Sequence, residues 1–148
     1  MTNAAQQQQK FWDLFNKELQ NQNNPFIIRH RKHYATVNKK SSDSGFCLGL
    51  DFLYRKELVR VGIYLLDDIS TFDFLHENKA EIEERLGFTP NWTIGGAKNP
   101  NVRRVDVLIS IIADNEESYL NAIQLAIIRA KQFINVIPSY LTAPLFDY

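Results

Sequence analysis

The residues best suited to chemistry in this chain are a run of cations between positions 29 and 40. These twelve residues contain five side chains that are positive at neutral pH, no acid and one tyrosine. Clustered cations can neutralise phosphates, and an interleaved aromatic ring can stack on a base. These residues are therefore candidates for a nucleic-acid-binding segment; the pattern is more often that of a solvated edge strand, on which lysine and arginine block sheet-to-sheet association. The candidate binding residues are Arg29, Arg31, Lys32, Tyr34, Lys39 and Lys40.

A second group of cations lies where a turn leads into a long apolar strand. Lys98 belongs to a turn rich in glycine and asparagine, and Arg103 and Arg104 enter the strand. If the sheet brings this turn beside the run at 29–40, the two groups form one patch. Because neighbouring residues of a strand point to opposite faces, only one of the two arginines can join that patch. The alternative is an arginine that pairs with Asp106 or with a helix carboxylate.

Motifs for catalysis are missing from the sequence. The pair Gly95-Gly96 is followed by no phosphate-loop lysine, and no GxSxG nucleophile motif occurs. Cys47 is the single cysteine, which argues against a zinc site and an internal disulfide. The acid-x-lysine triplet at 77–79 falls in a helical pattern, whereas a restriction-type nuclease needs it on a strand. We predict no catalytic residues, no metal and no cofactor.

Composition places the chain among ordinary globular proteins. Its 148 residues suit one domain over positions 1–148, and 17 basic residues balance 17 acidic ones. No global field therefore demands a polyanionic partner, and the near-neutral charge eases self-association, which leaves a homodimer open. No apolar stretch has the length of a transmembrane helix, and the polar start resembles no secretory signal. We expect a cytoplasmic protein that does not contact membranes.

The spacing of apolar residues predicts the elements that position these side chains. Helical spacing covers residues 2–21, 70–86 and 114–137, and Gly87 and Pro138 are expected to end the second and third helices. Strand patterns cover residues 26–37, 46–52, 59–65, 92–94 and 105–111.

Short turns between these strands favour antiparallel pairing. We predict an α+β fold, a two-layer sandwich in which three helices cover one face of a mostly antiparallel, four- to five-stranded sheet. The expected order of elements is α-β-β-β-α-β-β-α.

Short motifs along nearly the whole chain resemble one bacterial protein family. They are FWDLF at 11–15, FDFL at 72–75 and IEERLG at 82–87, followed by Trp92, a strand led by arginine and a terminal helix. This pattern is similar to the family catalogued as domain of unknown function 4268. Its members resemble C-terminal modules attached to nuclease-like domains in restriction or defence contexts, which implies an accessory role near nucleic acid.

We therefore expect a non-catalytic binding or accessory module associated with nucleic-acid processing or phage defence. Its partner would be nucleic acid or a nucleic-acid-processing protein. Two alternatives stay open. A metal-dependent, nuclease-like enzyme with an unrecognised site would use Asp51, Asp106 or Glu57, and needs two carboxylates within about 4–6 Å in a cleft. A protein–protein scaffold would expose an apolar patch of several hundred Å².

Overall fold

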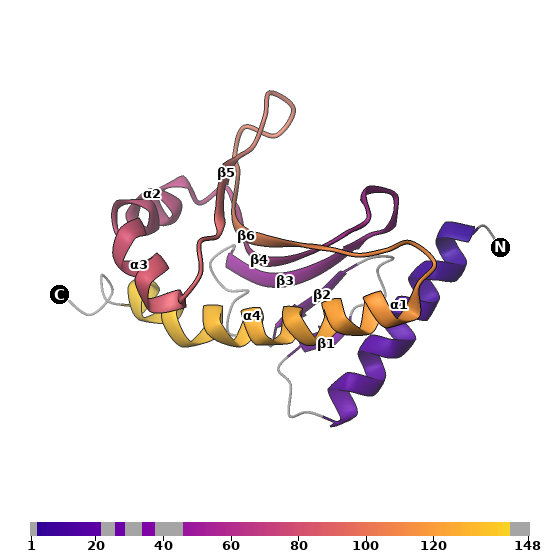
Figure 1. Ribbon diagram of the computed structural model, residues 1–148. Coiled ribbons are helices and arrows are strands. Elements are labelled where there is room, and N and C mark those ends of the chain that lie inside the picture. The colour runs from indigo at the N-terminus through magenta and orange to yellow at the C-terminus, as the bar shows by residue number, and fades with distance from the viewer. Residues whose placement is uncertain (1–2, 22–25, 29–33, 38–45, 143–148) are drawn as a thin grey trace.

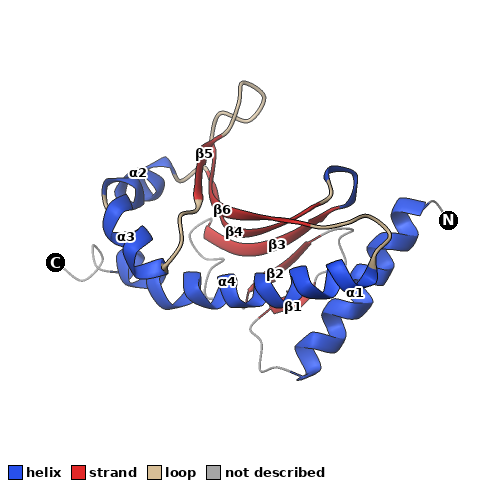
Figure 2. Cartoon of the chain, in the orientation of Figure 1, coloured by secondary structure: helices blue, strands red, loops and turns tan. Residues whose placement is uncertain are grey.

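The computed structural model describes residues 3–21, 26–28, 34–37 and 46–142 (Figure 1, Figure 2). These residues form four α-helices, one short 3-10 helix and six strands. The order is α1 (Asn3–Asn21), β1 (Phe26–Ile28), β2 (Tyr34–Val37), β3 (Phe46–Leu53), η2 (Tyr54–Lys56), β4 (Leu58–Leu66), α2 (Ile69–Glu77), α3 (Lys79–Leu86), β5 (Asn91–Ile94), β6 (Val102–Ser110) and α4 (Glu116–Thr142). No helix in these ranges has the length and apolarity needed to cross a membrane.

The described strands form one sheet in the order β1-β2-β3-β4-β6-β5, with every neighbouring pair antiparallel. The α+β class is confirmed, but the predicted element order was wrong, because the described chain has one more strand and one more helix than expected. The extra strand lies in residues 26–37, where Phe26 of β1 pairs with Val37 of β2. No glycine, proline, asparagine or aspartate separates these two strands in sequence, so the reversal had no signal.

The extra helix exists because the predicted helix 70–86 is interrupted at Asn78. The backbone of this residue, with φ −102° and ψ 19°, leaves the helical region. Its side-chain amide donates to the carbonyl of Phe74 at 2.9 Å, and its backbone N–H donates to that of Leu75 at 3.0 Å. These bonds separate α2 from α3. Gly87 ends α3 in the left-handed conformation, as predicted.

Pro138 does not end the last helix, contrary to the prediction, and α4 continues to Thr142. A proline here removes one backbone hydrogen bond close to the helix end. The last turn is held from outside the helix. The Tyr140 hydroxyl donates to the carboxylate of Glu81, and the Arg85 guanidinium lies 5.3 Å from the centre of the Tyr140 ring. Contacts with α3 therefore outweigh the local effect of proline.

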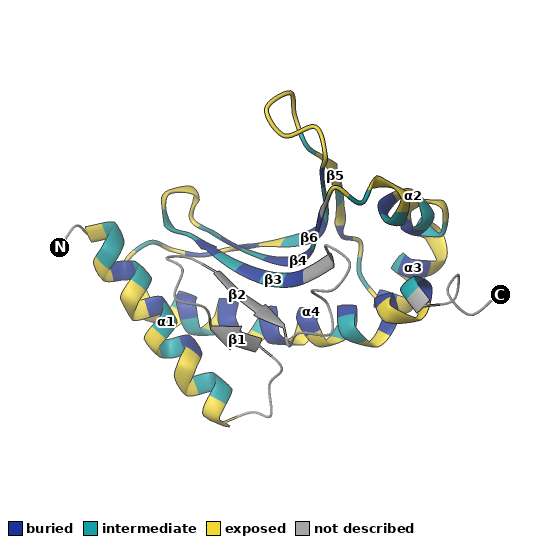
Figure 3. Ribbon diagram, turned by 180° about the vertical axis from the view of Figure 1, so that it is seen from behind, coloured by how far each residue is buried: buried dark blue, intermediate teal, exposed yellow. Residues whose placement is uncertain are grey.

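The core lies between the sheet and α4, which runs along one face of the sheet (Figure 1). Figure 3 shows the buried side of α4 turned toward the sheet and the exposed side turned away. Alternate residues of β3, β4 and β6 fill the other half of this layer and are buried: Leu48, Leu50, Phe52, Val59, Val61, Ile63, Leu65 and Val105. The opposite face of the sheet is covered by no described helix, and we call it the open face (Figure 1).

Helix α1 packs at one end of this core through aromatic residues. Phe11 is fully buried, and its ring centre lies 4.3 Å from that of Phe52 in β3 and 6.0 Å from that of Tyr119 in α4. The Tyr119 hydroxyl also donates to the buried Gln7 of α1 at 3.0 Å. The Phe11 ring of α1 thus contacts both the sheet and α4.

Replacing Phe11 with alanine is expected to lower the free energy of unfolding by about 3–5 kcal/mol, because it removes a buried ring and leaves a cavity. Urea denaturation measures this loss. Asn16→Ala, at an exposed position of the same helix, is the control and is expected to change stability by less than about 0.5 kcal/mol. Equal effects of the two substitutions would show that α1 does not pack on the core as described.

Candidate functional site

The open face is organised in rows of residues that run across the strands. The register pairs Gly49 with Gly62, Gly62 with Asp106, and Asp106 with Asn91. These four residues from β3, β4, β6 and β5 form what we call the central row. Because directly paired residues of antiparallel strands point to the same face, the row presents two glycines beside one carboxylate and one amide.

Gly62 is required by the close approach of β4 and β6. A Cβ atom at this position would lie 2.3 Å from the carbonyl oxygen of Val105 and 2.5 Å from the Cα of Asp106. Both neighbours are backbone atoms, which cannot move aside without shifting β6. The centre of the open face therefore has no side chain on β4, and Asp106 lies beside bare backbone.

Two charged or aromatic rows flank the central row. On one side, Asp51 pairs with Arg60, whose guanidinium lies 2.8 Å from the Asp51 carboxylate. On the other side, Tyr64 pairs with Arg104, whose guanidinium lies 5.2 Å from the centre of the Tyr64 ring. Each arginine is thus held by a cross-strand neighbour, and the two stand on either side of the glycines.

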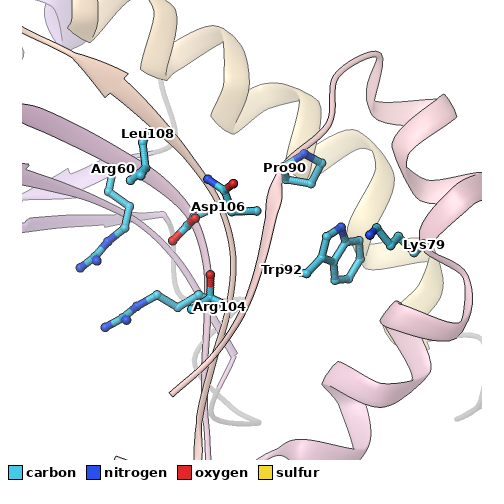
Figure 4. Close-up of a pocket in the computed structure, with 9 residues that line it drawn as sticks. Arg60, Lys79, Pro90, Trp92, Arg104, Asp106 and Leu108 are labelled. Atoms are coloured by element: carbon cyan, nitrogen blue, oxygen red, sulfur yellow. The ribbon is translucent and has the colours of Figure 1, made fainter. Parts of the chain in front are cut away.

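Asp106 is the buried charge of this face, with an exposed fraction of 5%. Burial raises the pKa of its carboxyl above the usual range for aspartate. The positive charges of Arg60 and Arg104 and a hydrogen bond from Asn91 act in the opposite direction, and the charge of Asp51 adds a smaller increase to the pKa. Figure 4 shows the Asp106 carboxylate between the side chains of Arg60 and Arg104.

A hollow of about 480 Å³ opens at this end of the central row. Figure 4 shows Arg60, Arg104 and Asp106 on one side of β5, and Trp92 and Lys79 on the other, so the hollow reaches around the edge strand. The lining combines three cations with one carboxylate and several hydrogen-bonding groups. It consists of Arg60, Lys79, Pro90, Asn91, Trp92, Thr93, Arg104, Asp106 and Leu108.

Most of the predicted basic segment lies outside the described residues. This holds for Arg29, Arg31, Lys32, Lys39 and Lys40. Tyr34 belongs to β2, where its register partner is Asp51 of the open face. The predicted convergence of residues 29–40 with residues 98–104 therefore stays a prediction.

The second predicted group is divided between three places. Lys98 is exposed in the turn between β5 and β6, which projects from the sheet (Figure 1). Arg103 lies on the helix-covered face, where its guanidinium is 5.9 Å from the ring centre of Phe72 and donates to the carbonyl of Pro100 at 2.7 Å. Arg104 alone belongs to the open face. The two arginines thus point to opposite faces, as the strand pattern indicated.

Sequence reasoning did not assign Arg60, Tyr64 or Asn91 to any site. Arg60 and Tyr64 occupy the polar positions between the buried residues of β4, so the alternation already placed them on the open face. Their grouping with Arg104 depends on the pairing of β4 with β6, which are separated by two helices and β5 in sequence. The grouping could have been predicted only if the order of the strands in the sheet had been known.

The carboxylates considered for metal chemistry do not gather into a ligand set. Asp51 is paired with Arg60, and a Glu57 side-chain oxygen accepts the backbone N–H of Ala113 at 3.3 Å. In the described ranges, no group of three or more histidine, cysteine, aspartate or glutamate residues could hold a metal ion. The observed arrangement favours binding through hydrogen bonds and arginines.

Comparison with protein families places the chain in a known sequence group. The family model for the domain of unknown function DUF4268 matches residues 7–141, which is most of the chain. The chain belongs to the DUF4268 family. The matched segment of this DUF4268 domain contains the whole open face and the hollow. Searches of curated proteins and of solved structures each found no significant match.

The close approach at Gly62 predicts that the DUF4268 domain does not tolerate a side chain there. Gly62→Ala is expected to lower the free energy of unfolding by about 2–3 kcal/mol, since the added methyl group must displace the backbone of β6. Urea denaturation measures the effect. Gly96→Ala is the matched control, because a Cβ at that position meets no atom within 4 Å. If the Gly62→Ala variant were as stable as the Gly96→Ala variant, the close spacing of β4 and β6 described above would be wrong.

The raised pKa of Asp106 predicts how stability depends on pH. A raised pKa in the folded protein favours the protonated form, so the resulting stabilisation is complete below the unfolded pKa. It is lost as pH rises through the folded pKa. The free energy of unfolding of Asp106→Asn, minus that of the unsubstituted protein, should therefore increase as pH rises from about 3 to 7. Denaturant titrations across this range measure the difference.

The same substitution at an exposed aspartate of α2, Asp73→Asn, controls for the general effect of removing one negative charge. The pH-dependent increase in the unfolding free energy relative to the unsubstituted protein should be clearly larger for Asp106→Asn than for the control. If the difference in unfolding free energy for Asp106→Asn decreased as pH rises, the charges of the two arginines would affect the pKa of Asp106 more than burial does.

Proposed function

We propose that this DUF4268 domain is a non-catalytic module that binds single-stranded nucleic acid across the open face of its sheet. The observation that carries the proposal is the pair of arginines on either side of the central row, one of them stacked on Tyr64. Nucleic-acid strands need cations for their phosphates and flat surfaces for their bases. Both are present within three neighbouring strands.

The charges of the hollow support this choice of partner. The lining residues Arg60, Lys79 and Arg104 contribute three positive charges and Asp106 one carboxylate, and Asp51 beside the hollow pairs with Arg60. A polyanion is attracted to such a surface even though the whole chain carries a formal net charge of zero.

The form of the open face favours an unpaired strand over a duplex. Tyr64 and the arginine guanidiniums offer planar groups on which successive bases can stack. The glycines of the central row place no side chain between the two flanking rows on β3 and β4. The basic segment 29–40 follows β1 in sequence and includes β2. In this proposal its cations supply further phosphate contacts.

The biological setting that fits is an accessory role in the cytoplasm of a bacterium. In that setting the domain holds a nucleic-acid strand, and a nucleic-acid-processing partner supplies the chemistry, as in restriction or phage defence. Two copies joined as a homodimer would double the binding surface. The setting is part of the proposal and rests on the resemblance stated in the sequence analysis; the balanced charge of the chain leaves a homodimer open.

Replacing Arg104 with glutamine is expected to weaken binding of a fluorescent single-stranded 12-mer roughly tenfold at low salt, because one charged hydrogen-bonding group is lost. The slope of log affinity against log salt should also become shallower by about one. Fluorescence anisotropy measures both quantities. Lys131→Gln, an exposed position on α4, makes the same charge change and should leave affinity unchanged.

The double substitution Arg31→Glu, Lys32→Glu tests the basic segment in the same assay and should also lower affinity. Absence of binding to single- and double-stranded DNA and RNA by the unsubstituted protein would overturn the proposed function. Binding that is equally weakened by Arg104→Gln and Lys131→Gln would move it away from the open face.

A further inference from the structure

The hollow has a polarity that a site for phosphates alone would lack. Its cations could bind an anion, yet the lining also contains the carboxylate of Asp106. An ionised carboxylate can only accept hydrogen bonds. An acceptor in this position repels phosphate oxygens and attracts N–H groups. The hollow therefore fits a ligand that has both an anionic part and an N–H edge. A nucleotide has both.

The bases differ in what they offer to a carboxylate. Guanine presents two neighbouring N–H donors on its Watson–Crick edge, which match the two oxygens of a carboxylate. Adenine, cytosine and uracil each place an acceptor beside their donor on this edge, so a carboxylate meets repulsion as well as attraction. A site with a buried, poorly hydrated acceptor discriminates strongly between such ligands, because an unmatched group stays unpaired.

We propose that the hollow at the β5 edge binds the guanine of a nucleotide, with the Asp106 carboxylate accepting its two Watson–Crick N–H groups. The cations of the lining, Arg60, Lys79 and Arg104, supply positive charge for the phosphates of the nucleotide. For a base within a strand, the inference rests on the proposed function; a free guanine nucleotide has the same chemistry.

Three observations support this role for Asp106. Its own neighbours leave it available, since the Arg60 guanidinium is paired with Asp51 and the Arg104 guanidinium lies over Tyr64. Asn91 of β5 is its register partner, and a hydrogen bond from its side chain lowers the pKa of the carboxyl and so favours the ionised form. A volume of about 480 Å³ also lies within the range of small-ligand sites.

The test measures base preference by fluorescence anisotropy. The probes are oligouridine 12-mers that carry guanine, inosine or adenine at the centre; inosine differs from guanine only by the missing amino group. The unsubstituted protein should bind the guanine probe about tenfold or more tightly than the other two. Asp106→Asn should bind all three within about twofold, at the affinity of the adenine probe. Asp73→Asn, an exposed aspartate on α2, should keep the preference.

The outcomes separate this inference from the proposed function. Equal binding of the three probes by the unsubstituted protein would overturn guanine recognition and leave strand binding intact. Binding of GMP but not of the 12-mers would support guanine recognition and overturn strand binding. Binding of neither would overturn both. Because the base series on the unsubstituted protein needs no variant, a failure of Asp106→Asn to fold would not prevent a decision.

Discussion

The close approach of β4 and β6 at Gly62 is the constraint on which the open face depends. Val105 and Asp106 leave no space for a Cβ atom, so the middle of the sheet carries no side chain on β4. Asp106 is therefore bordered by backbone on one side and by Asn91 on the other. The arginines, two positions away along each strand, become the nearest charges. One steric limit between two backbones thus produces a recessed carboxylate between two cations.

Packing on the other face of the sheet offsets the free-energy cost of burying the Asp106 carboxylate. Buried apolar residues of β3, β4 and β6 face α4 in one continuous core, and α1 closes its end through Phe11. Antiparallel sheets commonly bury one face and solvate the other. Because the hydrophobic driving force is concentrated on the helix side, the polar residues of the open face are not needed to hold the layers together. Their arrangement is therefore not constrained by the packing of the layers.

Local pattern predicted the parts of the fold that depend on local physics. The alternation on β4 and the left-handed Gly87 were recognised from period and residue type, and so was the divergence of Arg103 and Arg104. The break at Asn78 and the continuation past Pro138 were missed because side-chain bonds and α3 contacts decide them. The site was missed for a similar reason. Arg60 and Arg104 are distant in sequence, and only the pairing of β4 with β6 brings them together.

Asp106 itself is the strongest sign that the open face does more than close the sheet. A desolvated carboxylate usually costs stability, and an apolar residue of similar size would pack beside Gly62 at no such cost. The flanking arginines offset the cost in part, but burial still dominates the pKa of the carboxyl. Departures of this kind from the best local choice concentrate at functional sites. A buried carboxylate that lines an open hollow could also accept N–H groups of a ligand, which is the interaction that the guanine proposal assigns to Asp106.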